Sequence, residues 1–143
     1  MMEKRIEQAV ENFKSGYNCS QSVAAAFADY YGVEREVILR ASASFGGGIG
    51  RMRQTCGAAC GMFLLAGLEN GSVTPKDIIG RDNNYKLVQQ LAEQFAAENG
   101  SLICGELLGL TGDGSAPKAK RPCAQMVESA ARIFAEYLKN KQE

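Results

Sequence analysis

The sequence predicts an all-α protein, a single-domain bundle of six or seven helices with a glycine-rich loop. Apolar residues recur at helical spacing along most of the chain, and cap residues and glycines mark the helix ends. No stretch alternates polar and apolar residues as a half-buried strand does. At 143 residues, 45% of them hydrophobic, the chain is expected to form one domain, 1–143, with one core.

Three helices are expected before the glycine-rich loop. The first covers 3–15, where apolar residues share one helical face, and Gly16 ends it. Asn18 is a favourable cap for a second helix over 19–31, because its side chain can accept a hydrogen bond from an unpaired N–H of the first turn. A third, shorter helix is expected over 33–45.

The glycines of the stretch 46–50 interrupt this pattern, because each glycine weakens a helix by about 1 kcal/mol relative to alanine. Helix is expected to resume at Gln54 or Thr55, with Thr55 as its cap, and to run to Leu68. The segment ENGSV then forms a turn. The loop therefore separates the chain into two groups of helices.

The second half of the chain carries three further helix starts. Thr74 and Pro75 predict the first of them, since a cap followed by proline at the first helical position is a strong start signal. This helix is expected to reach Glu98, with Asn99 and Gly100 ending it. Ser101 is expected to cap a short helix. After a loop rich in turn-forming residues, Pro122 opens the last helix.

Composition excludes several classes of site. The chain has no histidine, which excludes Cys-His and Ser-His dyads and histidine metal ligands. Its 16 basic and 16 acidic residues cancel, so we expect neither nucleic acid nor a membrane surface as a partner. The longest apolar run, 62–68, is too short to span a bilayer, and no secretory signal is recognised. We expect a cytoplasmic protein, able to form a homodimer, with an unknown redox partner.

The five cysteines carry the chemistry. Four of them fall in the first turn of an expected helix, where unpaired N–H groups and the helix dipole favour a thiolate and lower the thiol pKa; these are Cys19, Cys56, Cys104 and Cys123. Arg51 and Arg53 before Cys56, and Lys118, Lys120 and Arg121 before Cys123, are expected to strengthen this effect. The alternative is that these cysteines only fill the core, as free cysteines often do.

Cys60 differs from the other four. It lies one helical turn after Cys56, where a disulfide between the two would be strained, so it is either a spare thiol or core filling. No C-x-x-C occurs, which excludes the thioredoxin motif and the common zinc and ferredoxin signatures. Any shared site must be assembled by the fold from distant segments.

The glycine loop allows three interpretations. It is a tight turn that lets helices pack closely, or a phosphate-binding loop, although GxGxxG and the Walker pattern are both absent. In the third, its bare backbone approaches a thiol site and binds a cofactor there; the candidate residues are Gly46, Gly47, Gly48, Gly50 and Arg51.

The segments GYNCSQSV, FGGGIGRM, CGAACG and CGELLG, with the late Cys123, together resemble the C_GCAxxG_C_C family of redox-active bacterial and archaeal proteins. The family cysteines map by motif onto Cys19, Cys56, Cys104 and Cys123, and Cys60 occupies a variable position of the CGAxxG motif. A similar segment occurs in a multihaem cytochrome that also carries an iron–sulfur cluster. The resemblance covers nearly the whole chain and implies redox activity.

Three functions stay open from the sequence. The four family cysteines could hold an iron–sulfur cluster or another thiolate-bound metal for electron transfer or sensing, which is the reading we favour. They could instead perform metal-free thiol–disulfide chemistry, with Cys56 as the nucleophile and Cys19 or Cys104 resolving. The chain could also be a non-enzymatic helical binding domain in which the thiols are incidental.

Overall fold

A computed structural model describes residues 2–109 and 122–142 of the chain, and Lys118, Lys120 and Arg121 lie outside these residues. Within them the protein is all-helical and contains no β-strand, which confirms the predicted fold class. The described residues contain seven regular α-helices: α1 (Met2–Lys14), α2 (Cys19–Ala25), α3 (Arg35–Ser42), α5 (Gly57–Asn70), α6 (Ile78–Asn99), α7 (Cys104–Leu107) and α8 (Cys123–Gln142). An irregular turn, α4 (Gly46–Ile49), and two short 3₁₀ segments complete the fold.

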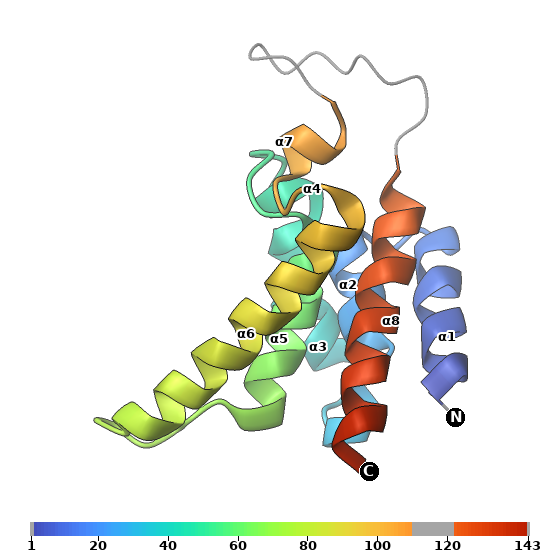
Figure 1. Ribbon diagram of the computed structural model, residues 1–143. Coiled ribbons are helices and arrows are strands. Elements are labelled where there is room, and N and C mark those ends of the chain that lie inside the picture. Colours follow the sequence, from blue (N-terminus) through green and yellow to red (C-terminus); the bar gives the residue numbers. More distant parts are fainter. Residues whose placement is uncertain (1, 110–121, 143) are drawn as a thin grey trace.

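The helices pack as a bundle in which α1 lies against α8 and α2, and α5 lies against α2 and α6 (Figure 1). Fully buried aromatic and aliphatic side chains fill the space between them, with Phe27 meeting Phe134 edge to face at 5.2 Å between ring centroids. Several small residues let the helices approach closely. At Gly61 of α5, for example, an added Cβ would lie 2.7 Å from the Ser20 carbonyl oxygen of α2.

Two expected helices are shorter than the periodicity suggests. The helix expected over 19–31 ends at Ala25 and continues as a 3₁₀ segment over Ala28–Tyr31, with Gly32 in a left-handed conformation behind it. The helix expected over 33–45 covers Arg35–Ser42 and is followed by a 3₁₀ turn. Both ends tighten because the chain must turn toward the next element.

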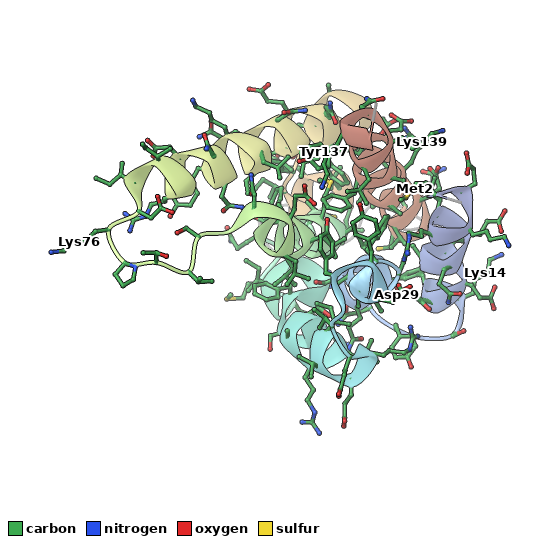
Figure 2. All side chains as sticks on the ribbon, turned by 90° about the horizontal axis from the view of Figure 1, so that it is seen from below. Met2, Lys14, Asp29, Lys76, Tyr137 and Lys139 are labelled. Atoms are coloured by element: carbon green, nitrogen blue, oxygen red, sulfur yellow. The ribbon has the colours of Figure 1, made fainter. Side chains whose placement is uncertain are left out.

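The predicted start at Thr74 and Pro75 is wrong. Helix α6 begins at Ile78, because the Asp77 side chain accepts a hydrogen bond of 2.9 Å from the Gly80 N–H and caps the helix there. Lys76, just before it, has a left-handed φ of 65° that a helix cannot include. Figure 2 shows Lys76 on the loop between α5 and α6, which projects away from the other helices.

Caps at the start of α2 and the end of α6 agree with the sequence. The Asn18 side chain accepts from the Gln21 N–H and the Gln21 side chain accepts from the Asn18 N–H, a complete capping box. Gly100, with φ 94°, ends α6. Among the described residues, no helix combines the length and hydrophobicity that a membrane crossing needs.

Candidate functional site

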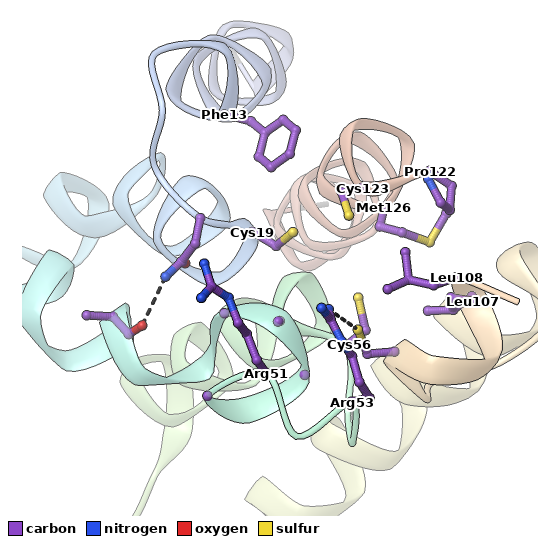
Figure 3. Close-up of a pocket in the computed structure, with 18 residues that line it drawn as sticks. Phe13, Cys19, Arg51, Arg53, Cys56, Leu107, Leu108, Pro122, Cys123 and Met126 are labelled. Carbon is purple, nitrogen blue, oxygen red and sulfur yellow. Dashed lines mark hydrogen bonds between the residues drawn. The ribbon is translucent and has the colours of Figure 1, made fainter. Parts of the chain in front are cut away.

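Cys19, Cys56, Cys104 and Cys123 line one cavity of about 590 Å³ at the end of the bundle where α2, α5 and α8 begin. Figure 3 shows this cavity between the glycine segment, α7 and the starts of α2 and α8. The predicted cofactor-binding residues, Gly46, Gly47, Gly48, Gly50 and Arg51, line the same cavity. The fold thus brings together every residue that the sequence marked as a candidate for the site, from four separate segments.

The four thiols stand at helix starts, as the sequence predicts. Cys19, Cys104 and Cys123 are the first residues of α2, α7 and α8, and Cys56 is the residue before α5. The expected cap Thr55 is displaced from this role, because its backbone pairs with Ile103 in an isolated antiparallel bridge. Cys56 therefore takes the cap position of α5.

That bridge joins two of the thiol-bearing segments. The Cys56 N–H donates to the Leu102 carbonyl at 2.7 Å, and the Cys104 N–H donates to the Gln54 carbonyl at 2.6 Å. The expected cap Ser101 does not cap α7, although its hydroxyl accepts from the Ile103 N–H. These short backbone bonds hold Cys56 and Cys104 at the same wall of the cavity.

The glycine segment forms a left-handed turn rather than a regular helix, as its composition predicts. Five consecutive residues, from Gly47 to Arg51, have φ between 59° and 71°, and Arg53 has φ 61°. Ile49, Arg51 and Arg53 are not glycine, so each carries a conformational cost of about 1–2 kcal/mol. The turn is held at both ends: the Gly50 N–H donates to the Gly46 carbonyl, and the Gln54 N–H donates to the Gly48 carbonyl.

Two glycines lie directly against the thiol-bearing residues. A Cβ added at Gly48 would lie 2.5 Å from Cys104 Cβ. One added at Gly57 would lie 3.3 Å from Cys19 Cβ and 2.8 Å from the Phe45 carbonyl oxygen. The absence of a side chain at both positions lets the backbone approach the thiols, so tight packing and approach to the thiol site are the same feature of the loop.

The prediction that Cys56 is a thiolate is wrong for the metal-free protein. Burial raises the pKa of its thiol to about 11, although the nearby N–H groups of Ala58 and Ala59 lower it. Negative charge at Cys104 or Cys123 would also raise the pKa of Cys56. A helix start alone therefore does not ionise a thiol that is only 5% exposed.

Cys19 and Cys123 form a hydrogen-bonded pair on the opposite wall. The bond to the Cys123 sulfur stabilises the protonated Cys19 thiol, and together with burial it raises the pKa of Cys19 well above its usual range. Both side chains are half-buried, and Figure 3 shows them side by side above the glycine segment. The four thiols therefore form two pairs. Cys19 and Cys123 are joined by a hydrogen bond between their side chains, and Cys56 and Cys104 are held together by backbone hydrogen bonds of their segments.

Arg53 donates from its guanidinium to the Cys104 sulfur at 3.7 Å, a contact that the sequence suggested only for Cys56 (Figure 3). No sequence pattern could reveal it, because it depends on the pairing of Thr55 with Ile103. Cys60 lies outside the cavity: it is buried in α5 and its thiol donates to the Thr55 carbonyl at 3.8 Å.

The donor set of the cavity consists of thiols. Its walls contain no aspartate or glutamate from the described residues. Across 2–109 and 122–142, no group of three or more cysteine, aspartate or glutamate side chains is arranged to hold a metal ion. The thiols share a cavity without converging on a single point.

Comparison with known proteins identifies one family, described as "Putative redox-active protein (C_GCAxxG_C_C)", whose match covers residues 17–137. This range contains all four cavity cysteines and the glycine segment. No curated protein and no solved structure matches the chain significantly.

Proposed function

Because the chain belongs to the C_GCAxxG_C_C family of redox-active proteins, we propose that Cys19, Cys56, Cys104 and Cys123 hold an iron–sulfur cluster. The observation that carries the proposal is that thiols from four separate helix starts line one cavity. Four cysteine thiolates are the common ligand set of two-iron and four-iron clusters. Such a cluster supplies one-electron transfer, either to a partner or as a redox signal.

The donor set fits this group better than it fits a single metal ion. A lone zinc ion needs its four ligands on a tetrahedron about 2.3 Å from one centre, and the described thiols are not arranged to hold an ion in that way. An iron–sulfur cluster spans ligands that stand farther apart, because several irons and inorganic sulfides lie between them. The 590 Å³ of the cavity offers room for such a core.

The residues around the thiols support the same ligand. Four bound thiolates need compensating positive charge, and burial excludes the water that would otherwise supply it. Arg53 already donates to the Cys104 sulfur, and the N–H groups of Ala58 and Ala59 act on Cys56. Hydrogen bonds of this kind to ligand sulfurs tune a reduction potential.

Thiol–disulfide chemistry is the second candidate, and the hydrogen bond between the Cys19 and Cys123 thiols favours it. Oxidation would join the two sulfurs and release two protons and two electrons to an acceptor such as a low-molecular-weight disulfide. The pKa is raised both for Cys56, through burial, and for Cys19, through its hydrogen bond to Cys123 and burial, so ionisation favours neither thiol as the attacking group. The direct hydrogen bond between Cys19 and Cys123 is what places that pair ahead of Cys56 for this chemistry.

The test is iron and labile-sulfide analysis, with a visible absorption spectrum, on protein purified without oxygen. We expect iron and sulfide in matching amounts, and we expect Cys56→Ser and Cys104→Ser to lose most of both. Cys60→Ser is the matched control, because Cys60 lies one turn farther along the same helix and outside the cavity. It should keep the iron of the unmodified protein.

Colourless, iron-free protein would overturn the cluster proposal. Peptide mapping after mild oxidation would then decide the second candidate: a Cys19–Cys123 disulfide would support it. If Cys-to-Ser changes at the cavity altered neither metal content, disulfide formation nor partner binding, the thiols would be incidental to a helical binding domain.

A further inference from the structure

Two arginines rise from the left-handed turn beside the thiols, at positions where glycine would be easier to accommodate. Arg51 has φ 64° and Arg53 has φ 61°, and both side chains line the thiol cavity. Backbone strain of this kind persists where a side chain is needed in one place, and it is concentrated at functional sites. Both residues therefore carry a conformational cost directly beside the thiols.

The two guanidinium groups differ in what they contact. Arg53 donates to the Cys104 sulfur. The Arg51 guanidinium has no hydrogen-bond or ion-pair partner in the part of the chain that the structure describes, and only the Arg51 backbone N–H is paired, with the Gly46 carbonyl. Figure 3 shows it extending past the glycine segment toward the start of α2, where Cys19 lies. Its donors remain available to a bound molecule.

The walls of the cavity favour a small anion. They carry the two arginines and no acidic residue from the described parts of the chain. Apolar side chains, among them Phe13, Leu107 and Met126, also line the cavity. A small-ligand site is typically such a concave, mostly apolar space with a few charged groups that fix the ligand.

We propose that Arg51, assisted by Arg53, makes the thiol cavity a binding site for a small anion with two or more oxygens, a carboxylate or an inorganic oxyanion. A planar guanidinium binds paired oxygens through two parallel hydrogen bonds. The groups that would bind the anion are therefore the arginines, and not the thiols that would bind iron. The proposal deepens the proposed function by naming the class of ligand for the same cavity, and it rests on that function only for the ligand's role in redox chemistry.

The test compares two thiol reagents that differ in charge, iodoacetate and iodoacetamide, on the full chain, reduced and treated with chelator. Circular dichroism checks that the chain stays helical, and peptide mass spectrometry assigns the rate at each cysteine. We expect cavity thiols to react faster with iodoacetate, relative to iodoacetamide, than the thiol of a small peptide does. In Arg51→Gln this preference should fall about tenfold, because a charged hydrogen bond to the reagent is lost.

Lys76→Gln is the matched control. Lys76 is exposed, has the same left-handed φ of 65°, and lies on the projecting loop between α5 and α6. It removes the same charge from the same backbone conformation without touching the cavity. The iodoacetate preference should be unchanged in this variant.

Competition identifies the ligand class. Inorganic phosphate and acetate are added separately, against chloride at equal ionic strength to match screening. Saturable protection by phosphate indicates an oxyanion site, and saturable protection by acetate indicates a carboxylate site. Protection by neither, or an equal effect of chloride, would overturn the proposal.

A second variant separates loss of the arginine side chain from loss of folded structure. Arg51→Gly relieves the left-handed strain and should raise the melting temperature by about 3–5 °C, while the iodoacetate preference falls as in Arg51→Gln. An unchanged preference in either variant would overturn the proposal. Because these measurements use metal-free protein, they can fail while iron and sulfide analysis succeeds, and the reverse.

Discussion

The two ends of helix α5 bury ionisable side chains in opposite ways. At its end, the Glu69 carboxylate is only 7% exposed and accepts hydrogen bonds from Tyr31, Tyr137 and Lys141 at 2.6–3.2 Å. Burial opposes its ionisation, but these three donors together hold its pKa below the usual range. At the start of the helix, burial of the Cys56 thiol prevails over its nearby N–H groups, and the pKa rises to about 11.

The difference lies in compensation. Glu69 meets a cation and two hydroxyl groups within the protein, so its charge is satisfied and the contact joins α5 to α8. The thiols of the cavity meet mainly one another, with Arg53 as the cation that contacts a sulfur. A buried group such as Glu69, whose hydrogen bonds are all made within the protein, stabilises the fold. Buried thiols that lack such partners are suited to binding an added ligand.

The largest expected effect comes from replacing one glycine by alanine beside each end of α5, Gly48 in the cavity wall and Gly67 in the last turns of the helix. Gly48→Ala should destabilise the protein by about 4 kcal/mol, because φ is 71° and the new Cβ would lie 2.5 Å from Cys104 Cβ. Gly67→Ala, near the other end of α5, has no atom within 4 Å of the new Cβ. It should stabilise the helix by about 0.5–1 kcal/mol. Urea unfolding measures both, and effects of the same sign would break the comparison.

Alkaline pH should weaken the cavity end. The folded protein holds the Cys56 proton more tightly than the unfolded chain does, since its pKa is about 11. This stability is complete below the unfolded pKa, near 8.5–9, and is lost as pH rises toward 11. In metal-free protein, the free energy of unfolding should fall between pH 8 and 11 by about 2–3 kcal/mol less in Cys56→Ser than in the unmodified chain. Parallel pH curves from urea unfolding would contradict this.

Acid pH should weaken the opposite end. The pKa of Glu69 is lowered in the folded state, so its contribution is present above the unfolded pKa of about 4.3 and is lost as pH falls through the folded value. Glu69→Gln should cost about 1–2 kcal/mol at pH 7 and lessen the decline in stability below pH 4. Glu36→Gln, which removes an exposed partner of Arg40, is the control and should change little.

The local features of the fold were readable from the sequence. Asn18 caps α2, Gly100 ends α6 and the glycine run breaks the helix, because each depends on the conformational preferences of a few adjacent residues. The start of α6 was misplaced because two local signals compete. Pro75 favours an early start, and the Asp77 side chain, bonded to the Gly80 N–H, prevails.

The sequence indicated which cysteines and glycines line the cavity, but not how the fold assembles them. Periodicity and caps place each thiol at a helix start, and the family motif groups them. The contact between Arg53 and Cys104 depends on backbone pairing between Thr55 and Ile103, which are far apart in the chain. Thiol pKa values depend on burial, which position in a helix does not give: Cys56 combines a helix start with near-complete burial, and burial decides.

The order in which the chain is synthesised has a consequence for the cavity. Cys19, Cys56 and Cys104 precede Cys123, which begins the last helix, and α8 packs against α1 at the other end of the sequence. Contacts of such long sequence separation form late, because their loop-closure entropy must be overcome first. A nascent chain therefore exposes three of the cavity thiols before Cys123 is made, and the proposed four-thiol ligand set is complete only once synthesis has passed Cys123.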